Sequence, residues 1–105
     1  MNWNFPKTKF VDDNDRDHQF EHVVSEVVEV SNAIALQESA GRIDEELMDL
    51  FHSLETYWRI QEKERGPEYV AGMRRYVTDK NAARDYYPAI RGFSALADCI
   101  QKDVP

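Results

Sequence analysis

The stretch FEHVVSEVVEVSNAIALQESAGRIDEELMDLFHSL, from Phe20 to Leu54, decides the fold of this chain. Its apolar residues recur every three or four positions in two blocks separated by Ala40-Gly41, which predicts two amphipathic helices joined by a short turn. Residues three apart share one helix face, with Cβ atoms about 5–6 Å from each other. Each block contains one such pair of acids: Glu26 with Glu29, and Glu46 with Asp49.

The acids border the apolar stripe of each helix instead of lying opposite it. At about 100° per residue, the first stripe centres on Val27, and each acid pair occupies one shoulder of its helix. The stripes are Phe20, Val23, Val24, Val27, Val30 and Ile34 in the first helix, and Ile43, Leu47, Leu50, Phe51, Leu54 and Trp58 in the second. If the stripes pack against each other in antiparallel helices, the two acidic shoulders face each other.

Four carboxylates gathered in this way favour a bound divalent cation. Like charges a few ångströms apart repel one another, so a fold that gathers them needs a cation or raised pKa values. An all-oxygen ligand set suits Mg²⁺ or Mn²⁺ better than zinc. His18 and His22 have the spacing of zinc ligands, but a third nitrogen or sulfur ligand is missing nearby, so we expect partial burial or support of the acids. The alternative interpretation is a pair of solvated acidic faces.

A third helix is predicted from about Pro67 to Arg84, and polar residues continue its apolar stripe. Lys80, Asn81 and Arg84 occupy positions at which the pattern places core residues. This placement predicts a pocket that holds an anionic group. The alternative is a cationic last turn that complements the helix dipole.

These residues together resemble a known family. Glu-x-x-Glu, a spacer of sixteen residues and Glu-x-x-Asp on two helices, followed by Lys80-Asn81-Ala-Ala-Arg84-Asp-Tyr-Tyr87-Pro88, is similar to the pattern of the MazG-like all-α nucleoside triphosphate pyrophosphohydrolases. The likeness covers about residues 19–88. It departs in the N-terminal arm and between the two motifs, which leaves open the base and sugar of the nucleotide.

The resemblance implies an all-α, four-helix MazG-like bundle that is completed by dimerisation. It implies Mg²⁺, or Mn²⁺, on Glu26, Glu29, Glu46 and Asp49, with Glu29 or Glu46 as the acceptor of the proton from the attacking water. It further implies nucleoside triphosphate binding by Lys80, Asn81, Arg84 and Tyr87, and hydrolysis to the monophosphate and pyrophosphate. Three alternatives stay open: a related pyrophosphohydrolase of the phosphoribosyl-ATP type, a non-catalytic helical interaction protein, and a di-iron bundle suggested weakly by Asp15-x-x-His18 and Asp49-x-x-His52.

The whole chain sets further bounds. Its 105 residues predict one domain, with an arm over residues 1–15 and a core over 16–103, that oligomerises as a homodimer or homotetramer. A net charge of −7 and a pI of about 4.9 disfavour a nucleic-acid duplex or a membrane surface as partner. The sequence has neither a membrane-spanning run nor a signal peptide, so a cytoplasmic location is expected.

The remaining helix boundaries and the single cysteine complete the expectations. The first two helices are expected over about 16–39 and 43–64, and a fourth packing helix over about 88–101. Arg65-Gly66-Pro67 is expected to end one helix and begin the next, and Asp15 or Asp17 to cap the first. The aromatic arm is expected to lie across its own domain or a neighbouring subunit. Cys99 is expected to be a reduced packing residue.

Overall fold

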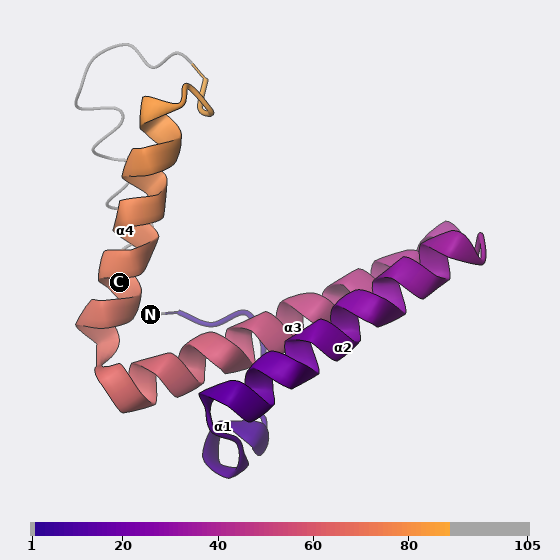
Figure 1. Cartoon of the computed structure of the whole chain (residues 1–105), viewed down its shortest axis with the longest axis horizontal. Coiled ribbons are helices and arrows are strands. Elements are labelled where there is room, and N and C mark those ends of the chain that lie inside the picture. The colour runs from indigo at the N-terminus through magenta and orange to yellow at the C-terminus, as the bar shows by residue number, and fades with distance from the viewer. Residues whose placement is uncertain (1, 89–105) are drawn as a thin grey trace.

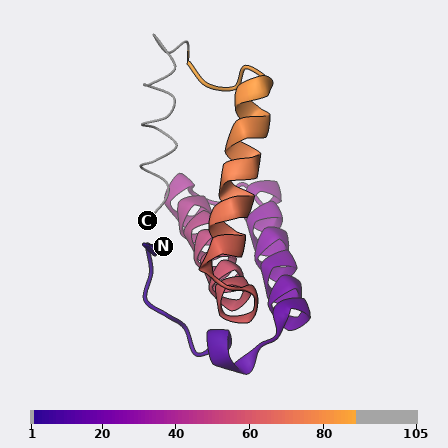
Figure 2. The same ribbon diagram turned by 90° about the vertical axis from the view of Figure 1, so that its left-hand side faces the viewer.

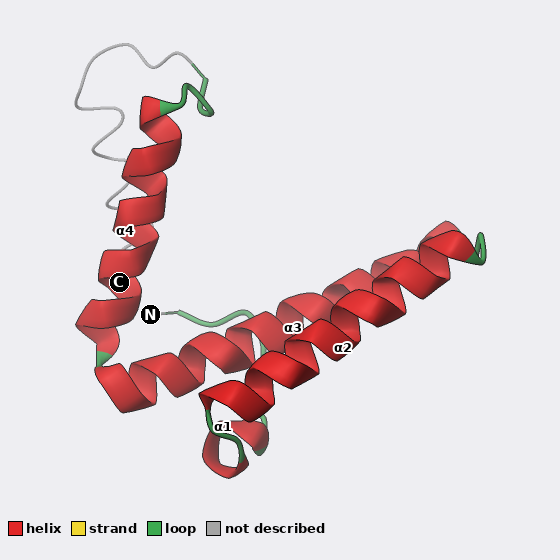
Figure 3. Ribbon diagram, in the orientation of Figure 1, coloured by secondary structure: helices red, strands yellow, loops and turns green. Residues whose placement is uncertain are grey.

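The computed structural model describes residues 2–88, and this part of the chain contains four helices and no strand (Figure 3). The helices are α1 (Phe10–Asp13), α2 (Arg16–Ala35), α3 (Ala40–Arg65) and α4 (Pro67–Ala83). The all-α prediction is therefore confirmed for these residues. No helix in them is both long and apolar enough to cross a membrane. The predicted fourth packing helix and Cys99 lie outside the described residues.

The ends of α2 follow from local hydrogen bonds. The Asp15 side chain accepts a hydrogen bond from the His18 backbone N–H, which confirms the predicted cap. The helix ends at Ala35, four residues before the predicted end, because Gln37 adopts a left-handed conformation with φ of 53°. The backbone N–H groups of Gln37 and Glu38 then bond to the carbonyls of Ile34 and Ala33, which is a Schellman motif formed without glycine.

The prediction that Ala40-Gly41 stops the first helix is wrong, because these residues begin α3. The Ser39 hydroxyl accepts a hydrogen bond from the Arg42 backbone N–H and caps α3 there. Because α3 begins at Ala40, the acids at positions 44–46 lie in its second turn. The other end agrees with the prediction: Gly66, with φ of 95°, ends α3, and Pro67 is the first residue of α4.

Helices α2 and α3 form an antiparallel hairpin, and α4 turns away from it (Figure 1). In a view turned by 90°, the upper part of α4 extends beyond the hairpin (Figure 2). The contact between α2 and α3 is unusually polar, because Gln19, Glu46 and Ser53 are buried there. Thr56 is also buried, next to Thr8 of the N-terminal arm. The fully apolar part of the core is small and consists of Val11, Ala33, Ile60 and Val70.

The predicted apolar stripes do not form the closed contact between the two helices, although Val23, Val30, Ile43 and Leu50 are half-buried. Phe20 is 58% exposed and Ile34 is 57% exposed, and much of the α3 stripe is also exposed. The hairpin is instead closed by the acidic shoulders, which lie about 100° around each helix from the stripes. In antiparallel helices these rotations place both stripes on one face of the hairpin. We call this the apolar face; its exposed members are Phe20, Val24, Val27, Ile34, Leu47, Phe51 and Leu54.

The N-terminal arm lies across its own chain, on α3. Glu55 accepts hydrogen bonds from the backbone N–H groups of Asn4 and Phe5 and from the Asn4 side chain, at 2.6–3.0 Å. The Phe5 ring stacks on His52 with centroids 4.4 Å apart, and the Arg59 guanidinium covers the Trp3 ring. The arm also contains α1, which the sequence pattern did not predict because four residues are too few to show a helical period.

Candidate metal centre

Three of the four predicted metal-binding carboxylates converge in the hairpin. Oxygen atoms of Glu26 on α2 and of Glu46 and Asp49 on α3 all lie within 4.8 Å of one another. We call these residues the acidic group. Glu46 is only 5% exposed, Glu26 is half-buried and Asp49 is exposed. The group therefore has a buried floor and an open side that faces solvent.

Glu29 is exposed and lies outside this group of three. Its negative charge nevertheless reaches Glu46 and raises the pKa of that carboxyl. We call Glu29 the rim residue, because it lies near the acidic group without belonging to it.

The electrostatic environment of Glu46 disfavours a bare carboxylate. Burial is the main effect that raises the pKa of Glu46, and the charges of Glu29, Asp49 and Glu26 raise it further. Arg42 opposes these effects, but the net pKa is still above its ordinary value. A cation placed among these carboxylates would relieve both the repulsion and the cost of burial.

Arg42 provides the positive charge nearest to the acidic group. Its Nη2 lies 2.6 Å from Glu46 Oε1, and its Nη1 lies 3.0 Å from Glu45 Oε2. Its Nε lies 3.8 Å from Glu38 Oε2. Arg42 was not among the predicted site residues, although its spacing of four from Glu46 on one helix is the spacing of intrahelical ion pairs.

A partly buried polar chain contacts Glu26. His22 Nε2 lies 3.6 Å from Glu26 Oε1, and His22 Nδ1 lies 2.7 Å from Ser53 Oγ. The Gln19 side-chain amide donates to Ser53 Oγ and to the Ser53 carbonyl, at 3.1 Å each. These bonds fix the rotamers of His22 and Ser53 between the two helices. The expectation that His22 supports the acids agrees with this arrangement.

The other histidines do not join the group. His18 Nδ1 lies 2.7 Å from Asp15 Oδ1 at the start of α2, and His52 stacks on Phe5 of the arm. His18 and His22 therefore bond to different partners and are not arranged as a zinc pair. The two acid-x-x-His pairs do not converge either, so the described residues give no support to a di-iron site.

The acidic group fits a small oxygen-liganded cation. Mg²⁺ binds oxygen at about 2.0–2.1 Å, so adjacent and opposite octahedral ligands are roughly 3 and 4 Å apart. A spread of 4.8 Å closes to these values by small side-chain rotations. Exposed acidic groups are common without a metal ion, however, so the burial of Glu46 is the more specific observation.

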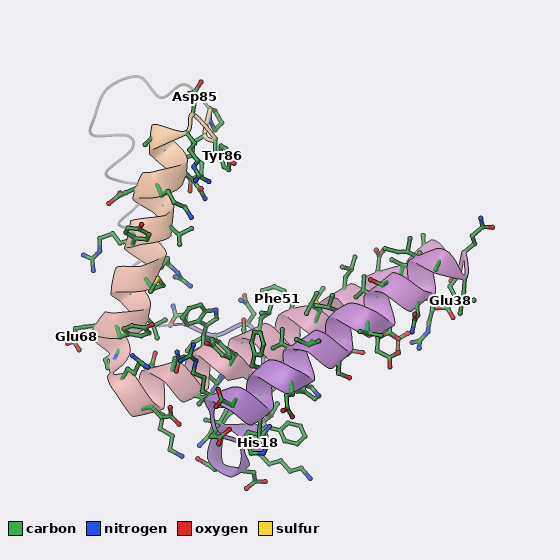
Figure 4. All side chains as sticks on the ribbon, viewed as in Figure 1. His18, Glu38, Phe51, Glu68, Asp85 and Tyr86 are labelled. Atoms are coloured by element: carbon green, nitrogen blue, oxygen red, sulfur yellow. The ribbon has the colours of Figure 1, made fainter. Side chains whose placement is uncertain are left out.

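The predicted substrate-binding residues lie at the far end of α4. Lys80 and Arg84 are exposed and Asn81 is half-buried, while its backbone carbonyl accepts from Arg84 and Tyr86. Figure 4 labels the neighbouring Asp85 and Tyr86 at the end of α4, well away from the hairpin. Within one chain, the structure does not bring Lys80, Asn81, Arg84 or Tyr87 to the acidic group.

A separate hollow of about 450 Å³ lies between the arm, α3 and α4. Its lining is mostly apolar and includes Trp3, Phe51, Trp58 and Met73. None of the predicted metal-binding or substrate-binding residues lines it. It is therefore distinct from the acidic group.

Comparisons of this chain with models of known protein families, with curated proteins and with solved structures found no significant match. A functional proposal consequently depends on the residues described above and on their geometry.

Proposed function

We propose that this protein is a Mg²⁺-dependent nucleoside triphosphate pyrophosphohydrolase of the MazG-like type. The observation that supports this proposal best is the convergence of Glu26, Glu46 and Asp49 from two helices, with Glu46 buried at the floor. A buried carboxylate beside two others is costly unless a cation accompanies it. The helical motif around these acids is the one that resembles the MazG-like family.

The residues of the acidic group have distinct roles in this proposal. Glu26, Glu46 and Asp49 hold the cation, and the rim residue Glu29 joins them or contacts a water beside them. When bound, Mg²⁺ would supply activation of a water and neutralisation of the leaving pyrophosphate. Ser53 is buried and bonded to His22 and Gln19, so its hydroxyl is not placed to attack a substrate as a covalent nucleophile.

Glu29 is the better placed of the two predicted proton acceptors. Glu46 Oε1 is already bonded to Arg42, and the residue is buried, so water reaches it poorly. Glu29 is exposed to solvent. A general base must lie within hydrogen-bond reach of the attacking water, and solvent reaches Glu29 more readily than the buried Glu46.

A second copy of this chain completes the proposed enzyme. The apolar face leaves large side chains exposed on two adjacent helices. Within residues 2–88, the hollow formed with the arm and α4 is lined by its members Phe51 and Leu54, and by none of its other members. Two hairpins packed through this face form a four-helix bundle. The partner surface is the same apolar face of a second copy, so the two faces can pack against each other about a two-fold axis.

Dimerisation also offers a route for the α4 residues to reach the substrate. Measured from Gly66 at 1.5 Å per residue, the acids on α3 lie about 25–30 Å away and Lys80 lies about 20 Å away along α4. One chain therefore holds the two motifs apart. In a dimer, Lys80, Asn81, Arg84 and Tyr87 of one copy would bind the triphosphate held by the acidic group of the other.

The experiment is pyrophosphate release from a panel of ribo- and deoxyribonucleoside triphosphates, with Mg²⁺ and with a chelator. We expect Mg²⁺-dependent release by the wild type and its loss in Glu46→Gln. Asp44→Asn is the matched control, because Asp44 is an exposed acid of α3 outside the acidic group. Equal activity of wild type and Glu46→Gln would contradict the proposed site.

The same panel separates the alternatives. Hydrolysis of phosphoribosyl-ATP in preference to nucleoside triphosphates would favour the related pyrophosphohydrolase. Absence of release from every substrate, with an intact dimer, would favour a helical interaction protein. The choice between dimer and tetramer and the cytoplasmic location stay predictions.

A further inference from the structure

Arg42 occupies a position where a bound cation and a bound substrate would both affect it. Its guanidinium bonds to Glu46 within the acidic group and to Glu45 outside it. The Arg42 side chain is 46% exposed, whereas the Glu46 side chain is 7% exposed. The arginine is therefore the movable partner of this ion pair, and the glutamate is the fixed one.

A divalent cation in the acidic group competes with Arg42 for the same carboxylate. Both positive groups are attracted to Glu46, and they repel each other at such a short distance. Displaced from Glu46, the guanidinium still has partners, because Glu45 and Glu38 lie on the solvent side within 3.0 and 3.8 Å. The displacement therefore leaves no unpaired buried charge on the arginine.

We propose that Arg42 is the resident counter-ion of Glu46, which the metal displaces, and that the released guanidinium then binds phosphate oxygens of the substrate. This inference rests on the proposed function. A guanidinium offers a planar fork of donors that fits two phosphate oxygens, and the half-exposed Arg42 side chain lies directly against a member of the acidic group. It would provide a phosphate contact from the same chain that holds the metal.

The proposal predicts effects of opposite sign on metal and on substrate. In Arg42→Gln, the cation no longer competes with a guanidinium, so Mn²⁺ should bind roughly 10-fold more tightly at low salt. The same variant should lose roughly 10-fold to 100-fold in kcat/KM, because a charge-assisted phosphate contact is missing. A residue that only stabilised α3 would not strengthen metal binding.

The test measures Mn²⁺ affinity by electron paramagnetic resonance and kcat/KM for a nucleoside triphosphate in wild type, Arg42→Gln and Arg42→Lys. Arg42→Lys retains the competing charge but not the fork, so it should keep wild-type Mn²⁺ affinity and still lose kcat/KM. Arg75→Gln, an exposed arginine of α4, is the control and should change neither quantity. Circular dichroism verifies that each variant is helical.

The outcomes separate this inference from the proposed function. If the wild type binds Mn²⁺ and releases pyrophosphate, but Arg42→Gln binds Mn²⁺ no more tightly, the displacement is refuted. If its kcat/KM is also unchanged, the phosphate contact is refuted as well. A wild type that binds no Mn²⁺ and releases no pyrophosphate would refute the proposed function itself, together with the inference that rests on it.

Discussion

Replacing Glu55 with alanine should detach the N-terminal arm and cost about 3 kcal/mol of folding free energy. Glu55 is 6% exposed, and it accepts from two backbone N–H groups and one side-chain amide of the arm. A hydrogen bond to a charged group contributes about 1.5–3 kcal/mol. Three such donors would exceed this loss if their contributions were additive, but they lie on two neighbouring residues and share one carboxylate, so we expect about half of the sum.

Urea unfolding followed by far-ultraviolet circular dichroism at fixed protein concentration measures this loss. In a separate thermal unfolding experiment, the melting temperature should fall by roughly 12 °C or more, at about 4 °C or more per kcal/mol for a domain of this size. Glu64→Ala is the control, because Glu64 is an exposed acid near the end of the same helix. A loss below about 1 kcal/mol would refute the role of Glu55 as the anchor of the arm.

The same pair of proteins should show a defined pH dependence. Burial by itself raises the pKa of Glu55, but hydrogen bonds from Asn4 and Phe5 outweigh burial and hold the pKa below its ordinary value. A lowered pKa stabilises the fold fully above the unfolded-state value of about 4.3, and this contribution is lost as the pH falls through the folded-state pKa. The difference between wild type and Glu55→Ala should be constant from neutral pH down to about pH 6 and shrink below about pH 4.

Three further predictions test the turns and the apolar face. Gly66→Ala should cost about 1–2 kcal/mol in urea unfolding, because φ at this position is 95°. Gly41→Ala is the control and should be neutral or stabilising, because Gly41 is helical and nothing lies within 4 Å of the added Cβ. Equal effects of the two substitutions would contradict the turn at Gly66. Ser39→Ala should lower stability by about 1 kcal/mol through loss of the α3 cap, and an unchanged unfolding midpoint would contradict that cap. Val27→Lys, on the apolar face, should shift the protein to monomers in analytical ultracentrifugation, while Glu21→Lys should not; an intact dimer in Val27→Lys would exclude the proposed interface.

The sequence pattern was sufficient to predict the three longer helices in residues 16–84. It predicted that four acids would face each other across packed stripes, whereas three of them converge because the shoulders themselves close the hairpin. The helical period places residues on a face whatever that face contacts, so Glu26 and Glu46 were correctly assigned to adjoining shoulders. The break at Gly66-Pro67 was also predictable, because glycine alone adopts φ of 95° easily.

The period does not say which face another helix covers, and this explains the main error. The stripes through Val27 and Leu47 were expected to form the core, but they are exposed, and the polar shoulders close the hairpin. The end of α2 was misplaced for a different reason. Gln37 adopts the left-handed conformation that usually indicates glycine, so the sequence contained no signal for that turn.

The most direct test of the central claim is a Mn²⁺ titration followed by electron paramagnetic resonance, with Mg²⁺ as competitor, on wild type, Glu46→Gln and Asp44→Asn. We expect the wild type and Asp44→Asn to bind Mn²⁺ in a way that Mg²⁺ reverses. Glu46→Gln should bind at least 10-fold more weakly, because a buried carboxylate ligand has been removed. Equal Mn²⁺ binding by wild type and Glu46→Gln would show that the acidic group is not a metal centre.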